Sequence, residues 1–249
     1  MGVTGGGGPG SLDLVDTGRL SLVHTRHPFP ASAASPTTRT LPTAPPKLPR
    51  MTGNPAPPTA TVRPFLVPHS PDWEPRGRAL TQDLLAALAP LAVRVEHIGS
   101  TSIPGMAAKP VFDLQVSVAD LEPVEAAFAG PLAARGFRLS PYRNDHVPAG
   151  LDDAPENWTK RLWTRRAADG VTAVNLHVRR TGSPGERFAL LFRDWFRAHP
   201  EAVPAYARFK QSLAGVVDST GVYADVKDPV VDLVITVAEP WAAATGWKA

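Results

Sequence analysis

The chain has 249 residues, of which 43% are hydrophobic, and this is enough to bury a substantial core. It contains no cysteine, which excludes disulfides, cysteine-ligated zinc and thiol catalysis. The formal charge of +3 resides in residues 1–60, with five basic and two acidic side chains, and the remainder is neutral, with 21 of each. Because a neutral domain does not attract a polyanion through its overall field, we expect no binding to nucleic acid.

Two further features concern location. No segment approaches the roughly 20 consecutive apolar residues that a membrane-spanning helix needs. Residues 1–10 contain neither the basic nor the apolar part of a signal peptide. We therefore expect a cytoplasmic protein that does not associate with membranes.

The first 60 residues are rich in glycine, proline, serine and threonine and show no sustained apolar period. Such a segment buries too little to offset the entropy of ordering it, so residues 1–60 are predicted to be a disordered extension. Residues 61–249 are predicted to form one α/β domain.

The first half of this domain alternates strands and helices. Leu80, Leu84, Leu88 and Leu91 recur at helical spacing. Apolar and polar residues alternate strongly over residues 111–118, which predicts a strand. The other predicted elements here are strands at 63–68, 93–98 and 137–139 and a helix at 121–135 that ends at Gly136.

The second half begins with a loop. Residues 140–157, rich in Pro, Asn and Asp, are predicted to run over the surface, and strands at 160–166 and 171–178 form a hairpin across Asp169 and Gly170. Helices follow, marked by Phe188 to Phe196, by Val203 to Leu213 and by residues 225–237. The expected fold is α/β (α+β), a mixed sheet flanked by helices with a C-terminal helical portion.

The segment from Glu96 to Asp113 is the best candidate for a working site. Gly99 lets the backbone approach a ligand, and Ser100, Thr101 and Ser102 offer hydroxyls and amides at a predicted helix start, where an anion such as phosphate is favoured. Asp113 on the next strand is positioned to hold Mg²⁺ at that phosphate. The alternative is an ordinary capped turn followed by a polar strand residue.

This segment reads EHIGSTSIPGMAAKPVFDL and closely resembles the signature of the GrpB family. The resemblance extends over about residues 63–237 and leaves residues 1–60 without a counterpart. It is supported downstream by NLHV at 175–178, FRDWFR at 192–197, and Tyr206, Lys210, Tyr223 and Lys227.

The resemblance implies a nucleotidyltransferase-like fold, and a similar domain follows some dephospho-CoA kinases, where a folding-assistance role has been suggested. In active nucleotidyltransferases the Gly-Ser turn holds phosphates and three carboxylates bind two metals. Asp113 matches the first carboxylate, but Gln115 stands at the second position and His177 in place of the third. Two metals need more anionic oxygens than this, so only a single Mg²⁺ on Asp113 and His177 is expected.

Two functions of different class follow. The first is a ligand-binding or accessory module for a nucleotide or another phosphorylated small molecule; the alternative is an active Mg²⁺-dependent nucleotidyltransferase acting on an unidentified acceptor. A chaperone-like role would need a protein partner, for which no surface is identifiable. Asp113 is the candidate catalytic and metal-binding residue, and the candidate substrate-binding residues are Gly99, Ser100, Thr101, Ser102, Lys109, His177, Lys210, Tyr223 and Lys227.

Other polar residues have plainer interpretations. His97, at a strand end, is expected to satisfy local groups in preference to a ligand. The arginines of the hairpin are expected to be solvated, with binding of an anionic substrate as the alternative; they are Arg161, Arg165, Arg166, Arg179 and Arg180. On the helix that follows, Arg193, Asp194 and Arg197 are expected to form solvent-facing ion pairs, with a site-facing role as the alternative.

Overall fold

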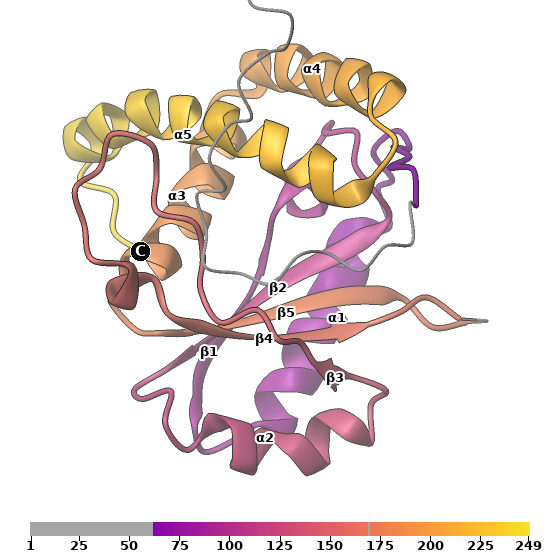
Figure 1. Ribbon diagram of the computed structural model, residues 1–249, viewed down its shortest axis with the longest axis vertical. Helices are drawn as coiled ribbons and strands as arrows, with labels where there is room; N and C mark the ends of the chain where they lie inside the picture. Colours follow the sequence, from indigo (N-terminus) through magenta and orange to yellow (C-terminus); the bar gives the residue numbers. More distant parts are fainter. Residues whose placement is uncertain (1–61, 169) are drawn as a thin grey trace, which may run out of the picture. The chain divides into compact units, whose positions relative to one another are not determined.

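A computed structural model describes residues 62–168 and 170–249 (Figure 1). The predicted extension at residues 1–60 and one residue of the predicted hairpin turn, Asp169, lie outside these ranges. Within them, no helix combines the length and the apolar character that crossing a membrane would require.

A five-stranded mixed sheet forms the centre of the domain, in the order β1-β2-β5-β4-β3. The parallel pair β2 and β5 lies in the middle, and the other pairs are antiparallel. The strands are β1 (Ala92–Ile98), β2 (Val111–Val118), β3 (Arg138–Leu139), β4 (Lys160–Arg165) and β5 (Ala173–Arg180).

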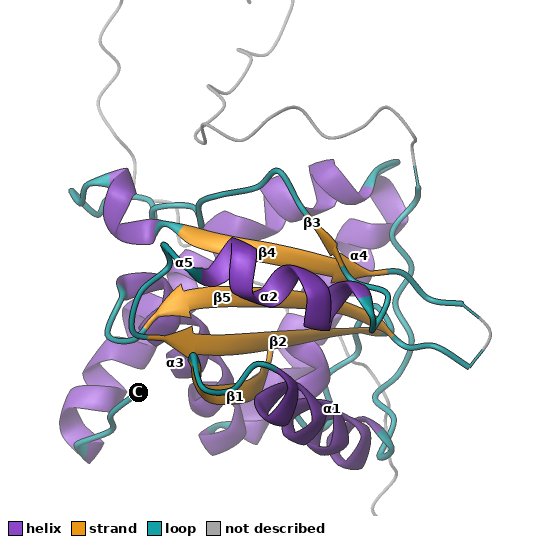
Figure 2. Cartoon of the chain, turned by 90° about the horizontal axis from the view of Figure 1, so that it is seen from below, coloured by secondary structure: helices purple, strands orange, loops and turns teal. Residues whose placement is uncertain are grey.

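Helices cover both faces of the sheet. Figure 2 shows α1 (Trp73–Ala87) and α2 (Val124–Ala133) on one face, with α3 (Pro184–Ala198), α4 (Val203–Val216) and α5 (Thr220–Thr245) on the other. The predicted α/β fold, a mixed sheet flanked by helices with a C-terminal helical portion, is therefore confirmed.

Alternation along the two central strands separates the core from the polar groups. Leu114 and Val116 of β2 and Leu176 of β5 are fully buried in a cluster with the apolar side chains of α1 and α2. Because side chains alternate along a strand, Asp113 and His177 project from the opposite face, toward α3, α4 and α5. This face carries the polar chemistry of the domain.

Two predicted elements differ from the structure. Residues 63–68 form no strand; one isolated bridge joins Val67 to Ala108. The last helix is longer at both ends than residues 225–237, because Ser219 caps its start by accepting a hydrogen bond from the Val222 amide and Gly246 ends it in a left-handed conformation.

Candidate functional site

A cavity of about 450 Å³ lies between the polar face of the sheet and the C-terminal helices. It is bounded by β2, β5, the Gly-Ser turn (residues 99–102), α3, α4, α5 and the loop that precedes β4. Nine of the ten predicted site residues line it, and Ser102 does not. The nine are Gly99, Ser100, Thr101, Lys109, Asp113, His177, Lys210, Tyr223 and Lys227.

The Gly-Ser turn depends on Gly99, which has a φ of 66°. A Cβ at this position would lie 2.5 Å from Oδ2 of Asp113, so only glycine lets the carboxylate pack against the turn. The Ser102 hydroxyl donates to the Gly99 carbonyl at 2.7 Å, and the Thr101 hydroxyl lies 2.9 Å from the His97 ring. These two hydroxyls stabilise the turn, and Ser100 supplies the hydroxyl that is left for a ligand.

His97 supports the turn from outside the cavity. Its ring stacks on Phe112 with 5.1 Å between centroids, and it packs so closely on α1 that a Cβ at Gly77 would overlap it. Burial lowers the pKa of His97 to about 4, which keeps the ring neutral. The structure agrees with the local interpretation of this histidine.

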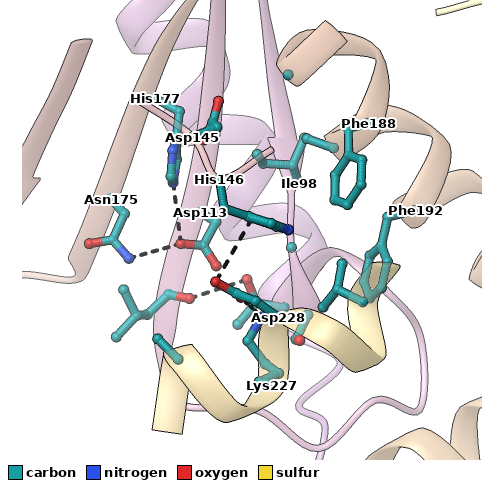
Figure 3. A pocket seen from close by; sticks show the side chains of 18 of the residues that line it. Ile98, Asp113, Asp145, His146, Asn175, His177, Phe188, Phe192, Lys227 and Asp228 are labelled. Atoms are coloured by element: carbon teal, nitrogen blue, oxygen red, sulfur yellow. Dashed lines mark hydrogen bonds and ion pairs between the residues drawn. The ribbon is translucent and has the colours of Figure 1, made fainter. Parts of the chain in front are cut away.

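Asp113 is an ionised acceptor at the floor of the cavity. Its Oδ1 accepts a hydrogen bond of 2.8 Å from the Asn175 amide, and His177 Nε2 lies 3.9 Å from the same oxygen (Figure 3). Burial alone would raise the pKa of Asp113, but His177, Asn175 and the charge of Lys109 outweigh it and hold the pKa below its ordinary value.

Lys160 of β4 and Arg179 of β5 form a compensated cation pair with Asp145. The Asp145 carboxylate accepts from Lys160 Nζ at 2.6 Å and from two Arg179 nitrogens at 2.7 and 2.8 Å. Although burial raises its pKa, the two cations hold it far below the ordinary value, so Asp145 is ionised. Both cations lie 3.4 Å from His177 Nδ1, and burial with these charges lowers the pKa of His177 to about 4.

A second cationic group, the lysine cluster, consists of Lys109, Lys210 and Lys227. Lys210 is 2% exposed and donates to Ser100 Oγ at 2.8 Å and to the Ala107 carbonyl at 2.7 Å. Burial, reinforced by the charge of Lys227, lowers its pKa to about 7, and burial also lowers the pKa of Lys109. Among residues 62–168 and 170–249, no carboxylate pairs with Lys109 or Lys210, whereas Lys227 pairs with Asp228 at 3.3 Å.

The opposite wall of the cavity is apolar. Phe188 and Phe192 of α3 and Ile98 of β1 line it, away from Lys227 in Figure 3. The loop before β4 contributes His146, whose ring meets Phe188 edge-on at 5.6 Å and whose Nε2 lies 2.6 Å from Asp232 of α5. The cavity thus offers both a charged and an apolar surface to one ligand.

Sequence reasoning missed the compensated pair. The loop at residues 140–157 lies at the surface as expected, with Asp145 partly buried. Arg179 was expected in a solvated hairpin, but it is 5% exposed and pairs with Asp145 across 34 positions. Its strand position was informative, since residues 175, 177 and 179 share one face. The expectation for Arg179 was wrong because α3 and this loop cover that face.

Arg193 forms the expected ion pair with Asp194, at 2.7 Å, but the expectation that it faces solvent was wrong, because α3 turns this side chain toward β1. Arg193 is 8% exposed, and its guanidinium donates to Glu96 at 2.6 Å and to the His97 carbonyl at 3.1 Å. Arg197 donates to the Ser102 carbonyl at 2.9 Å. These arginines hold the Gly-Ser turn from behind without lining the cavity.

The predicted Mg²⁺ ligands, Asp113 and His177, lie side by side, but they are only two donors. Mg²⁺ prefers six oxygen ligands in octahedral geometry. In the part of the chain that the structure describes, no group of three or more His, Asp or Glu side chains is arranged to hold a metal ion. The described side chains therefore supply no protein-only cage for Mg²⁺, and the other positions around an ion on Asp113 and His177 would have to come from water or from a ligand.

Comparison with known proteins agrees with the architecture and the motif. Residues 63–236 match the family described as GrpB protein, and the chain belongs to this family. The solved structure of conserved protein GrpB from Enterococcus faecalis is similar with a TM-score of 0.57 and 25% identity, covering 71% of this chain and 99% of that one.

Two relatives show how the domain occurs elsewhere. A dephospho-CoA kinase of Mycolicibacterium paratuberculosis is 35% identical over 201 residues, which make up 74% of this chain and 48% of the kinase. UPF0157 protein YqkA of Bacillus subtilis is 32% identical over 159 residues, 64% of this chain and 42% of that protein. The chain therefore spans about half the length of these relatives.

Proposed function

We propose that the cavity binds the phosphate group of a nucleotide or another phosphorylated small molecule, and that the domain is a ligand-binding or accessory module. The observation that carries this proposal is the state of Lys109 and Lys210. The Lys210 ammonium is buried against Ser100 of the Gly-Ser turn, the partly buried Lys109 places its ammonium over the Tyr223 ring, and neither pairs with a described carboxylate. A buried charge without a counterion is costly, and an anionic ligand would supply one.

The charge and size of the cavity support the same proposal. Five cationic side chains and three carboxylates line it, an excess of two positive charges when the histidines are neutral and Lys210 is protonated. Its volume of about 450 Å³ is within the range of small-molecule sites. The apolar wall suits the organic part of such a molecule, and the relatives named dephospho-CoA kinase make coenzyme A precursors natural candidates.

Binding is favoured over catalysis because the position of a second carboxylate has another use. Gln115 is fully buried; its carbonyl accepts from Arg179 at 2.6 Å and its amide donates to the Glu186 carbonyl at 3.4 Å. It therefore connects β2 to β5 and α3. The active nucleotidyltransferase would have to work with the single carboxylate of Asp113.

Thermal unfolding of the full chain tests the proposal. Inorganic phosphate, nucleotides and coenzyme A precursors are added separately, with and without Mg²⁺, and the ligand is recovered afterwards. A ligand at about 100 times its Kd should stabilise the protein by about 2.7 kcal/mol, which raises Tm by roughly 5 to 10 °C. The recovered ligand should be unchanged.

Two variants locate the binding. Ser100→Ala removes the hydroxyl that Lys210 contacts, and the Tm shift should fall in this variant. Ser219→Ala is the matched control, because Ser219 caps α5 away from the cavity lining. If no phosphate compound shifts Tm under any condition, the proposed function is wrong, and conversion of a nucleotide would identify an enzyme instead.

A further inference from the structure

We infer that the lysine cluster holds the phosphate group directly, without a bridging divalent cation. This inference rests on the proposed function and specifies how the same cavity recognises its ligand. Lys109, Lys210 and Lys227 would take the role that metal ions have in Mg²⁺-dependent phosphate sites.

The first argument is the environment of Asp113. Its Oδ1 accepts a hydrogen bond of 2.8 Å from the Asn175 amide, and its Oδ2 packs so closely on the turn that a Cβ at residue 99 would lie 2.5 Å away. One oxygen is therefore hydrogen-bonded to β5, and the other is packed against the turn. A carboxylate in this position shapes the anion site and has little freedom to reorient around a metal.

The second argument is the tautomer of His177. Its Nδ1 lies 3.4 Å from both Lys160 Nζ and an Arg179 nitrogen, two groups that can only donate hydrogen bonds. In a neutral ring this places the lone pair on Nδ1 and the proton on Nε2, the nitrogen that faces Asp113. A protonated ring nitrogen cannot bind a metal, so His177 acts as a donor beside Asp113.

The third argument is that positive charge is already in place. Each lysine of the cluster comes from a different element: Lys109 precedes β2, Lys210 is on α4 and Lys227 is on α5. The positive charges of Lys109 and Lys227 repel that of Lys210, and the Asp113 carboxylate attracts it. Ammonium groups fixed in a largely desolvated wall bind an anion more strongly than the same groups in water.

Isothermal titration calorimetry of the full chain with inorganic phosphate tests this inference. Binding is measured in EDTA and in saturating Mg²⁺. We expect the same affinity in both media or a weaker one with Mg²⁺. Binding that requires Mg²⁺ would overturn the inference and leave the proposed function intact. No binding of inorganic phosphate in either medium would also overturn the inference, whereas the proposed function fails only if the nucleotides and coenzyme A precursors do not bind either.

Asp113→Asn separates the two modes of binding most sharply. If Asp113 held a metal, this substitution would abolish phosphate binding. If the ammonium groups bind phosphate directly, removal of a neighbouring negative charge should tighten binding in EDTA by several-fold. Circular dichroism establishes that the variant is folded, and loss of binding by folded protein contradicts the inference.

Lys210→Met tests the central ammonium. Loss of a charge-assisted hydrogen bond should weaken phosphate binding in EDTA by roughly tenfold or more. Lys248→Met, at the exposed end of the chain, is the matched control and should leave the affinity unchanged. If Lys210→Met does not fold, Lys109→Met measures the same contribution. If a folded Lys210→Met or Lys109→Met variant binds phosphate with unchanged affinity, the lysine cluster does not hold the phosphate group.

Discussion

The two cationic groups of the cavity differ in how their charge is balanced. Lys160 and Arg179 share the Asp145 carboxylate, and all three side chains are buried or nearly so. Lys210 is at least as deeply buried, yet it contacts a hydroxyl, a carbonyl and the Tyr206 ring, and no described carboxylate pairs with it. Burial alone therefore does not distinguish the two groups. The difference is that the counterion of Lys160 and Arg179 is part of the fold, whereas we propose that a ligand supplies that of Lys210.

The largest expected effect is on the compensated pair. Asp145→Asn leaves Lys160 and Arg179 buried without a carboxylate, which should lower the free energy of unfolding by about 3 to 5 kcal/mol. Chemical denaturation measures this change. Asp152→Asn in the same loop, at an exposed position, should change stability by less than about 0.5 kcal/mol. Equal effects of the two substitutions would mean that the pair does not need its anion.

A smaller effect is expected from crowding the same pair. A Cβ at Gly185 would lie 2.5 Å from Asp145 Oδ2 and 3.3 Å from Arg179 Nε, so Gly185→Ala should cost about 1 to 3 kcal/mol. Gly215→Ala on α4 is the control, because a Cβ at that site would meet nothing within 4 Å, and alanine favours a helix by about 0.5 to 1 kcal/mol over glycine. If urea unfolding shows that Gly185→Ala lowers the free energy of unfolding while the control raises it, the pair of Lys160 and Arg179 with Asp145 is rigidly packed.

The last effect, which is measured per pH unit, is a pH dependence that belongs to Lys210. Its folded pKa of about 7 is below the ordinary value of 10.5, so the unfolded chain binds more protons between these values and the free energy of unfolding rises with pH. The slope is at most about 1.4 kcal/mol per pH unit. Lys210→Met should remove this contribution, and the difference between the two proteins separates it from those of Lys109 and Lys160, whose pKa values are also lowered.

Phosphate sharpens this test, since a bound anion should raise the pKa of Lys210 and flatten the slope of stability against pH in the wild-type protein but not in Lys210→Met.

Asp145 contributes to the pH dependence of stability at low pH. Its pKa is lowered in the folded protein, so its stabilisation is present above the ordinary value of 3.8 and is lost as pH falls below it. A wild-type slope above pH 7 that Lys210→Met leaves unchanged would show that Lys210 is not the titrating group.

Sequence patterns predicted what depends on local periodicity. The alternation over residues 111–118 matched β2 at both ends, and the alternation over residues 174–178 placed Asn175 and His177 on a polar face. These strand predictions succeeded because strand faces are fixed by neighbours in the chain. Of the ten site residues that were named, nine line the cavity, and their role in binding stays a prediction.

The predictions that failed concern partners brought together over long distances in the sequence. The loop that supplies Asp145 has no periodicity, and its composition alone indicates solvent exposure. Arg193 reaches Glu96 across 97 positions, a contact that exists only after α3 packs on β1. A sequence shows which side chains are charged, but the identity of each counterion depends on tertiary packing.

The parallel pairing of β2 with β5 connects the chemistry of the cavity to the choice of strand register. Asp113 lies beside Asn175, Gln115 beside His177, and Ser117 beside Arg179. If either strand slipped by one residue, its polar side chains would enter the apolar cluster beneath α1 and α2. The polar side chains of this face thus select against a one-residue slip during folding, because such a slip would bury charged groups such as Asp113 or Arg179 in the apolar core.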